Sequence, residues 1–411
     1  MVGENSAAAG AESGGPLTGY KIVDLTGMIS GPFATMMLGD QGADVIKVES
    51  FSGDYVRAGG HRSGGLAASF VNNNRNKRSI AIDLKNPQGR DVLLRLAASA
   101  DVFIQNFRPG VVERLGVGEA DVRAMRSDIV YVSLNGFGES GPYAAKPVYD
   151  PIIQAVSGLA SVQGGSDDNP PRLVRTILPD KLTAVTAAQA ITAALLARER
   201  SGAGQHVRLS MLDAVLAFLW SSDMGGQTFV DNPVSAQRAA SFIDLIYATE
   251  DGYISVAVMS DREWRALTTA LERPDWLDDP RFTTPALRDQ NIDDRLSLIQ
   301  EVLKTRGSAE WLERLEAAGV PCAPVLTRNE LVTHEQVVAS NIIVESDHPH
   351  AGRLQQARPA ARFDVTPPGI RRGAPLLGEH TDEILGEIGV SADRIAALRA
   401  DGVINRALDS D

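Results

Sequence analysis

The chain is poor in cysteine, in long apolar runs and in positive charge. Its 411 residues include one cysteine, Cys322, which excludes an intrachain disulfide and a cysteine-rich metal site and is compatible with the cytoplasm, where we expect the protein. No run of about twenty apolar residues occurs, so no membrane span is predicted. Lysine and arginine number 40 against 52 aspartates and glutamates, a net charge of −12. This balance disfavours general binding to nucleic acid or to an anionic membrane.

The beginning of the chain lacks the features of a signal peptide. Residues 1–16 have no basic region followed by an apolar one and are rich in alanine, glycine, serine and glutamate, so we expect a disordered tail. The whole chain contains 44% hydrophobic and 22% charged residues, which is typical of a globular protein with a sizeable core. Its length allows two domains or one large interrupted domain.

Short apolar runs alternate with helical connections up to about residue 135. The sequence predicts strands and a helix in a βαβ unit, at residues 21–25, 33–40 and 43–49, and more strands at residues 79–84, 101–105 and 129–134. This alternation predicts an α/β, doubly wound (Rossmann-like) domain with a ligand crevice at the carboxyl ends of its strands. The first turn, TGMISGP, is not G-x-G-x-x-G, so a nicotinamide dinucleotide is not expected.

The stretch 178–220 predicts two helices around a short strand at residues 205–210. Apolar residues occupy nearly every face of the first helix, which begins around Asp180, and this pattern predicts a buried helix. Aspartate is favoured as an N-cap, the leading interpretation of Asp180 from the residues alone. The alternative is a carboxylate nucleophile, because aspartate, with a reference pKa of about 3.9, is ionised at pH 7. Asp150, before a predicted helix at 151–159, has the same N-cap interpretation.

The character of the chain changes after Trp220. Residues 221–241 are polar and contain glycine, which predicts a linker. A hairpin and three helices then predict a smaller α+β domain over residues 242–325, with the hairpin at 242–258 and the helices at 261–271, 291–305 and 308–318. Residues 326–411 are expected to return to the large domain, whose first part spans 17–220.

Six segments of the chain resemble the family III CoA-transferases, a family that includes α-methylacyl-CoA racemases and carnitine-type CoA-transferases. They keep the family's order and cover about residues 18–388: VDLTGMISGPFATMMLGDQGADVIKVE, NRNKRSIAIDLK, NFRPGVVERLG, RERSGAGQHVRLSMLDAVL, GVPCAPV and APLLGEHTDEIL. The resemblance implies two interlocked subunits in a homodimer. Each subunit has a large doubly wound domain made from both chain ends and a small domain between them.

The resemblance also implies an activity and a catalytic residue. Enzymes of this kind move CoA from an acyl-CoA to a carboxylic acid, so both are expected partners, and CoA is a substrate rather than a permanently bound cofactor. The catalytic aspartate of the family falls on Asp180, which would form an aspartyl anhydride and then an aspartyl-CoA thioester. A capping role for Asp180 at the same time is compatible with this.

Several positions match the CoA-binding residues of the family. They are Ile82, Lys85, Asn106, Phe107 and Arg114, with Lys85 and Arg114 as expected phosphate partners. Met28 and Ile29 match residues near the thioester. Arg78, in a basic cluster that runs from Arg75, is a further candidate for holding phosphate.

The chain departs from known patterns of the family at three places. Ser50 replaces an arginine of the formyl-CoA transferases, so one phosphate contact is missing or comes from Arg57 or from the cluster Arg75 to Arg78. Residues 239–245 contain no glycine where those enzymes have a glycine run, which disfavours formyl and oxalyl substrates.

The third departure concerns the choice between transferase and racemase. Tyr149-Asp150 stands where the racemases have His-Asp, and tyrosine, with a reference pKa near 10, is a poor replacement for histidine as a base. A CoA-transferase is therefore favoured. An acyl-CoA racemase or epimerase with Tyr149 and Asp150 in its site, and a CoA-binding protein without activity, are the alternatives.

Overall fold

The computed structural model describes residues 14–232, 234 and 245–405. Contacts within the chain divide it into two compact units, Met1–Gln237 with Asn341–Asp411, and Arg238–Ser340. The sequence-based prediction put the second boundary at residue 325, before the short helices α15 (Arg328–Leu331) and α16 (Glu335–Ser340). Of the predicted tail, residues 1–13 lie outside the described residues, whereas Gly15 is buried and the Leu17 N–H donates to the Gln41 carbonyl at 2.8 Å.

The larger unit is built on a seven-stranded sheet with the order β14-β5-β2-β1-β6-β7-β8. All neighbouring strands are parallel except β14, which pairs antiparallel to β5. The parallel strands, numbered along the chain, have the doubly wound order 3-2-1-4-5-6, which confirms the α/β class and puts the topological switch between β1 and β6. The strands are β1 (Lys21–Leu25), β2 (Asp44–Glu49), β5 (Lys77–Ile82), β6 (Val102–Gln105), β7 (Val130–Asn135), β8 (His206–Ser210) and β14 (Ile404–Asn405).

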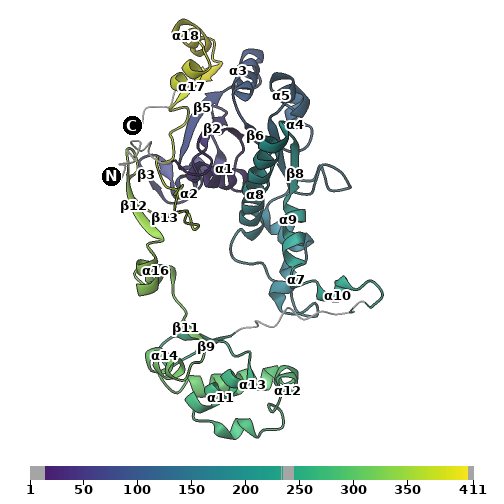
Figure 1. The fold of residues 1–411 in the computed structure, drawn as a ribbon, viewed down its shortest axis with the longest axis vertical. Helices are drawn as coiled ribbons and strands as arrows, with labels where there is room; N and C mark the ends of the chain where they lie inside the picture. Colours follow the sequence, from purple (N-terminus) through teal and green to yellow (C-terminus); the bar gives the residue numbers. More distant parts are fainter. Residues whose placement is uncertain (1–13, 233, 235–244, 406–411) are drawn as a thin grey trace, which may run out of the picture. The chain divides into compact units, whose positions relative to one another are not determined.

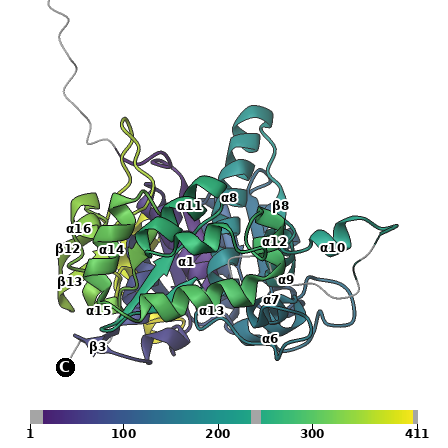
Figure 2. The same ribbon diagram turned by 90° about the horizontal axis from the view of Figure 1, so that it is seen from below.

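Helices cover both faces of this sheet. On one face α1 (Ser30–Asp40) and α8 (Leu178–Ser201) lie side by side (Figures 1 and 2) and bury apolar residues against the strands. The other face packs against α3 (Pro87–Ala98), α5 (Glu119–Met125), α17 (Thr381–Glu387) and α18 (Ala392–Ala400). Burial on both faces explains why the strands read as continuous apolar runs. Residues near both ends of the chain thus build one unit.

The helix α8 corrects one sequence-based prediction. Its side toward α1 and the sheet is buried, as at Ala184 and Ile191, but Val185 and Leu196 are each 52% exposed. The prediction of a helix buried all round was therefore wrong for the single chain, because α8 is the outer layer of the unit and only one side of it meets other elements.

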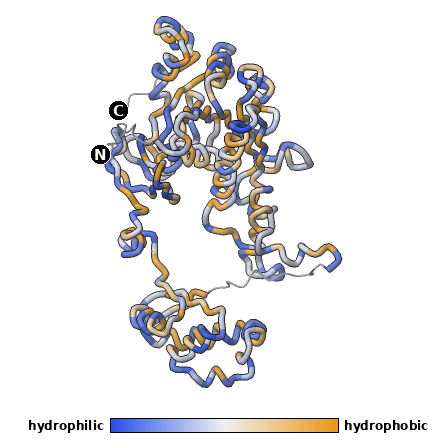
Figure 3. Tube along the Cα trace, viewed as in Figure 1, coloured by the Kyte–Doolittle hydropathy of each residue, from blue (hydrophilic) through white to orange (hydrophobic). Residues whose placement is uncertain are grey.

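The smaller unit has its own sheet and core. Its antiparallel strands β9 (Ile246–Ala248), β10 (Tyr253–Val256) and β11 (Cys322–Pro324) confirm the predicted hairpin, of which residues 242–244 lie outside the described residues. The helices α11 (Asp261–Ala270), α13 (Ile292–Leu303) and α14 (Ser308–Ala317) pack on it around three buried tryptophans, Trp264, Trp276 and Trp311. Hydrophobic and hydrophilic residues alternate along the trace of this unit (Figure 3), as expected for helices with one buried side.

Short elements connect these layers. They are η1 (Tyr55–Arg57), β3 (Arg62–Ser63), β4 (Leu66–Ala67), α2 (Ala68–Asn74), α4 (Val111–Leu115), α6 (Asp150–Val156), α7 (Leu159–Gly164), α9 (Met211–Leu219), α10 (Gly225–Thr228), η2 (Pro274–Leu277), α12 (Pro285–Gln290), β12 (Ile343–His348) and β13 (Gly352–Ala357). Within the described ranges, no helix combines the length and the apolar content that crossing a bilayer requires.

Candidate active site

The turn between β1 and α1 is hydrogen-bonded to three side chains from other segments of the larger unit. Asn106, after β6, accepts from the Gly27 N–H at 2.9 Å and donates to the Gly27 carbonyl at 2.8 Å. Asp54 accepts from the N–H of Met28 at 3.1 Å, and Lys47 on β2 donates to the Thr26 carbonyl at 2.9 Å. Met28 has a φ of +68°, a conformation that is uncommon outside glycine. These contacts fix where α1 begins.

The structure places Asp180 in the first turn of α8, at its third residue. The helix starts at Leu178, and its N-cap, Ile177, makes no side-chain cap hydrogen bond, so the prediction of Asp180 as the N-cap was wrong. Pro179 at the second helical position explains this, because proline fits the first turn of a helix and the helix begins before the aspartate. An aspartate in the first turn still gains from the positive end of the helix dipole.

Asp150 lies directly beside Asp180. It is the first residue of α6 rather than its N-cap, which corrects the second capping prediction. Asp150 is 3% exposed, and its Oδ2 accepts a hydrogen bond from the backbone N–H of Asp180 at 3.2 Å. Its other oxygen accepts from the Gln154 side chain at 2.6 Å. The first turns of α6 and α8 thus hold two carboxylates together.

Burial and Asp150 raise the pKa of Asp180 to about 6. Burial is the larger cause, because a low-dielectric environment penalises the ionised form, and the negative charge of Asp150 adds to it. Hydrogen bonds from the hydroxyl and the backbone N–H of Ser30, the first residue of α1, oppose this shift. Asp180 is therefore ionised at neutral pH but poorly solvated, as suits a carboxylate nucleophile.

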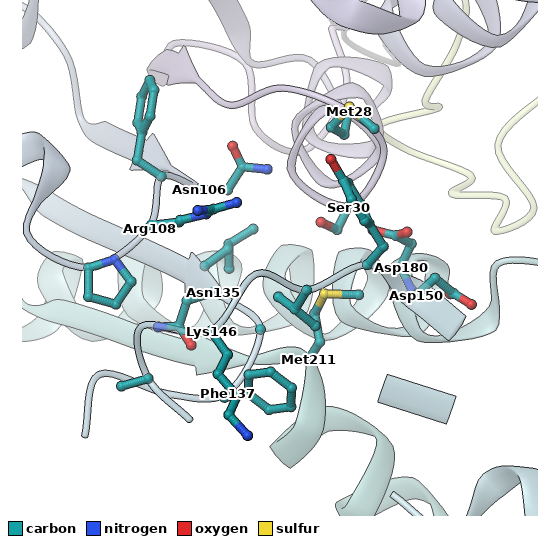
Figure 4. Close-up of a pocket in the computed structure, with 17 residues that line it drawn as sticks. Met28, Ser30, Asn106, Arg108, Asn135, Phe137, Lys146, Asp150, Asp180 and Met211 are labelled. Carbon is teal, nitrogen blue, oxygen red and sulfur yellow. Dashed lines mark hydrogen bonds between the residues drawn. The ribbon is translucent and has the colours of Figure 1, made fainter. Parts of the chain in front are cut away.

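Asp180 and Asp150 line a cavity of about 230 Å³, which we call the first cavity. Figure 4 shows the two aspartates next to each other at one end and Arg108 entering from the opposite side. The lining combines apolar side chains with amides, hydroxyls and two cations; it includes Met28, Ser30, Asn106, Phe107, Arg108, Asn135, Phe137, Lys146, Tyr149 and Met211. This lining fits a polar reacting group attached to a less polar chain.

Comparisons with known proteins identify the family of this chain. The profile of CoA-transferase family III matches residues 17–381. The chain belongs to this family. It is 35% identical to an acyl-CoA transferase of Fusarium pseudograminearum over 97% of this chain and 91% of that protein. It is 32% identical to the human succinyl-CoA:glutarate CoA-transferase over 95% and 90%. A crystal structure of a CAIB/BAIF family protein from Brucella suis superposes with a TM-score of 0.81 at 31% identity, covering 91% of this chain and all of that one.

A second cavity of about 450 Å³ in this family III protein lies at the carboxyl ends of β1, β2, β5 and β6. Four of the predicted CoA-binding residues line it, namely Ile82, Lys85, Asn106 and Phe107, and so does Met28. Met28, Asn106 and Phe107 also line the first cavity. The structure therefore brings these predicted residues together along one surface that leads to Asp180, at the switch point where ligands of doubly wound folds bind.

Three other predicted residues lie elsewhere. Arg114 is exposed on α4, and its neighbour Leu115 lines the second cavity. Ile29 is the N-cap of α1 and lines neither cavity. Arg78 is occupied by ion pairs within the chain. Its guanidinium binds Asp44, Glu383 and Glu387 at 2.6 to 3.0 Å, and its side chain is 8% exposed. The three carboxylates that already use its donors disfavour the assignment of Arg78 to a phosphate.

The other cations that could replace the phosphate contact missing at Ser50 also form ion pairs with carboxylates of this chain. Arg57 binds the Glu49 carboxylate through two nitrogens at 2.7 and 2.8 Å. Arg75 binds Asp40 through two nitrogens, and Lys77, which is fully buried, binds Asp24 at 3.0 Å. The basic cluster seen in the sequence is therefore a set of internal ion pairs rather than a binding surface.

Several lining residues were not predicted from the sequence. Ser30 carried no signal, because it is one of many serines in turns. Arg108 follows the predicted Asn106 and Phe107 in the same turn after a strand, and this position was a signal that could have found it. Lys146 lies in the loop before α6, and its ammonium sits over the Tyr143 ring at 3.2 Å from the centroid. Tyr149 lines the first cavity and is 66% exposed.

Proposed function

We propose that this protein transfers CoA from an acyl-CoA thioester to a carboxylic acid, with Asp180 as the nucleophile. The observation that carries the proposal is Asp180 itself, a carboxylate with a raised pKa that lines the first cavity. This cavity shares lining residues with the second cavity, the predicted CoA site. A nucleophile with these properties is matched to an acyl group held against it.

The proposed reaction conserves the thioester. A carboxylate oxygen of Asp180 attacks the thioester carbonyl carbon, the C–S bond breaks, and CoA leaves as a thiolate. The thiolate then attacks the aspartyl carbonyl of the anhydride, which releases the donor as a carboxylate and leaves Asp180 as a CoA thioester. The acceptor carboxylate attacks this thioester and expels the thiolate, which gives a second anhydride, between the acceptor and Asp180. The thiolate then attacks the acyl carbon of the acceptor in this anhydride and forms the new acyl-CoA. Asp180 is regenerated and no water is consumed.

The names of two relatives guide the choice of acceptor. One is a succinyl-CoA:glutarate CoA-transferase and another, from Acetobacter aceti, an acetyl-CoA:oxalate CoA-transferase. Both names pair an acyl-CoA with a dicarboxylic acid, so we propose dicarboxylic acids as the acceptors to test first. Arg108 and Lys146 support this proposal, because they line the first cavity and have no carboxylate partner in the part of the chain that the structure describes.

A racemase is less well supported by the geometry. Such an enzyme exchanges protons on opposite faces of one carbon, which requires two bases that face each other across the substrate. Asp150 and Asp180 instead lie on one side of the first cavity, joined by the hydrogen bond from the Asp180 N–H. Tyr149 is held at the rim and more than half exposed. This arrangement favours transfer.

We also propose that the protein acts as a homodimer. The support is the family resemblance together with large apolar side chains that a single chain leaves exposed, among them Val185 and Leu196 on α8 and Phe218 on α9. A second copy of the chain would remove such side chains from water. Sedimentation of the intact protein over a range of concentrations tests the proposal, and a monomer at micromolar concentration would contradict it.

Mass spectrometry of the trapped intermediate tests the proposed mechanism. The protein is mixed with a panel of acyl-CoAs, treated with hydroxylamine and digested. Hydroxylamine converts an aspartyl anhydride or thioester to a hydroxamate, so we expect a hydroxamate at Asp180 in the wild type. The Asp180→Asn variant, which keeps the size and loses the nucleophile, serves as the control. Transfer at the wild-type rate by Asp180→Asn would reject the role of Asp180.

A further inference from the structure

Lys77, the first residue of β5, is a fully buried lysine that binds the first turn of α1. Its side chain is 0% exposed. Its ammonium donates three hydrogen bonds, to Oδ2 of Asp24 at 3.0 Å, to the carbonyl of Pro32 at 2.9 Å and to Oδ1 of Asn74 at 2.8 Å. These acceptors belong to β1, α1 and α2, so one ammonium joins three elements to β5.

The contact with Pro32 connects Lys77 to the active site. Pro32 lies two residues after Ser30, whose hydroxyl and N–H donate toward the carboxylate of Asp180. The Asp24 oxygen that binds Lys77 also accepts from the hydroxyl of Thr35 on α1, at 2.6 Å. Lys77 and Asp24 thus fix the position of the start of α1 relative to β1 and β5. Lys77 lines neither cavity, so it can influence the reaction through α1.

The ammonium form of Lys77 has one donor for each of its three acceptors. A lysine ammonium carries three N–H groups, whereas the neutral amine carries two and a lone pair. After the loss of one proton, one of the three buried acceptors has no donor from Lys77, which is unfavourable. The charge of Asp24 makes it the strongest acceptor. The loss therefore falls on Pro32 and Asn74, which connect α1 and α2 to β5.

The environment of Lys77 favours this loss at moderately alkaline pH. Burial lowers the pKa of Lys77 to about 8, from an ordinary value of 10.5; the carboxylate of Asp24 opposes this shift, and the positive charge of Lys47 on β2 adds to it. The other charged residues around Lys77 form pairs of their own, namely Lys47 with Asp54 at 3.0 Å and Asp40 at the end of α1 with Arg75 after α2 at 2.7 Å.

Loss of this proton does not by itself unfold the protein. Between pH 8 and 10.5 the unfolded chain binds more protons at this lysine than the folded protein does. The free energy of unfolding that this group contributes therefore rises with pH in this range. An effect of Lys77 on activity above pH 8 is thus a change within the folded protein.

We propose that Lys77 is a positioning residue for CoA transfer, whose ammonium keeps Ser30 in place beside Asp180 and whose loss of a proton sets the alkaline limit of the activity. This inference rests on the proposed function, in which Asp180 attacks the thioester. It assigns Lys77 a role that a purely stabilising ion pair does not have, because activity and stability should respond to alkaline pH in opposite directions.

The pH dependence of kcat in the wild type is the first measurement. Between pH 7 and pH 9.5 we expect kcat to fall by about tenfold or more while KM changes much less, since a displaced start of α1 affects the reacting end of the site. Circular dichroism over the same range should show a folded protein. A constant kcat, or loss of the fold below pH 9.5, would overturn the proposal.

A matched pair of variants on α2 assigns the alkaline limb to Lys77. Asn74→Asp places a carboxylate beside the ammonium, which should move the limb to higher pH by about one unit or more. Asn73→Asp is the control. Both side chains donate to the carbonyl four residues earlier, Asn73 to Ser69 at 2.7 Å and Asn74 to Phe70 at 3.0 Å, but Asn73 is not a partner of Lys77. A limb at the same pH in both variants would reject the inference.

Lys77→Met keeps the length of the side chain and removes its three donors. We expect kcat at pH 7 to be about tenfold lower or less than that, and the alkaline limb to disappear. A limb that persists in Lys77→Met would assign it to another group and reject the inference. If this variant does not fold, the two asparagine variants decide the question.

Failure of this inference is distinguishable from failure of the proposed function, because transfer by the wild type at pH 7 is measured first. If transfer occurs and Asn74→Asp leaves the alkaline limb in place, the inference fails while the proposed function stands. If no acyl-CoA gives transfer at any pH, the proposed function fails, and the inference that rests on it fails as well.

Discussion

The backbone N–H of Asp180 donates a hydrogen bond to Oδ2 of Asp150 at 3.2 Å, so two helix starts hold two carboxylates side by side. The negative charge of Asp150 disfavours ionisation of the neighbouring Asp180 carboxyl. Burial and this neighbouring charge together raise the pKa of Asp180 to about 6, so the carboxylate is still ionised at neutral pH without the help of a base. Four consequences of this arrangement and of the contacts around it can be measured.

The first prediction concerns the pH dependence of transfer. Asp180 must be ionised to attack, and its pKa is about 6, so the rate of the wild type should fall as the pH decreases through 6. Asp150→Asn removes one of the two causes that raise this pKa, and the acid limb should move to lower pH. The measurement is kcat/KM from pH 4.5 to 8. Asp83→Asn, which removes a carboxylate from the other cavity, is the control, and an equal shift in both variants would contradict the assignment.

The second prediction concerns stability. Because the pKa of Asp180 in the folded protein, about 6, exceeds its reference value of 3.8, the ionised carboxylate destabilises the fold at neutral pH. The free energy of unfolding contributed by this group should fall as the pH rises from about 4 through 6. Asp180→Asn should therefore be more stable than the wild type at pH 7, by about 1–2 kcal/mol.

Urea unfolding at pH 4 and pH 7 checks this prediction. The difference between wild type and Asp180→Asn should become smaller from pH 7 to pH 4, because the carboxyl is then protonated in the folded wild type and partly protonated in the unfolded chain. A variant that is less stable than the wild type at pH 7 would show that the ionised Asp180 gains more from Ser30 than it loses by burial.

The sheet was predictable from the sequence because its strands are buried on both faces. The predicted strand at residues 21–25 agrees with β1, and the five other predicted strands agree with parallel strands of the sheet to within two residues at each end, whereas the antiparallel β14 was not predicted. The match follows from the contrast between apolar runs and polar connections. The error at α8 has the opposite origin, since an apolar pattern does not reveal whether a helix face is covered by the same chain.

The charged residues of the site were less predictable. Lys47, Lys77 and Arg78 all look like surface cations in the sequence, and each is buried because a carboxylate from another strand or helix lies beside it. Such pairs join residues 7 to 309 positions apart in the chain. No local pattern encodes them, and for this reason the sequence could point to Asp180 as a candidate nucleophile but could not distinguish cations free to bind a ligand from structural ones.

The third prediction concerns the buried ion pairs behind the turn. Asp24 is fully buried between Lys77 and Lys47, and despite its burial these lysines hold the pKa of Asp24 well below its usual range. Asp24→Asn leaves the buried ammonium of Lys77 without its carboxylate partner and should cost about 3–5 kcal/mol of unfolding free energy. Urea unfolding at pH 7 is the measurement. Asp275→Asn, at an exposed pair with Arg273, is the matched control and should cost less than about 1 kcal/mol.

The last prediction concerns the turn that positions Ser30 against Asp180. Asp54 receives the N–H of Met28 at 3.1 Å and the ammonium of Lys47 at 3.0 Å, so one carboxylate joins the strand β2 to a residue with φ of +68°. This contact holds the backbone two residues before Ser30. We therefore expect Asp54 to be a positioning residue rather than a group that meets the reacting atoms.

Asp54→Ala should lower kcat by about tenfold or more and change KM much less, because misplacing the start of α1 affects the reacting end of the site more than the binding of the nucleotide. Asp54→Asn keeps an oxygen that can accept from the Met28 N–H and should recover part of kcat. Val365→Ala, a change at a side chain that is 76% exposed and lines neither cavity, is the control and should leave kcat near the wild-type value. A rise in KM at unchanged kcat in Asp54→Ala would instead assign Asp54 to ligand binding. The split between the two constants is informative here because Asp54 lines the second cavity, while the residue it positions lines the first.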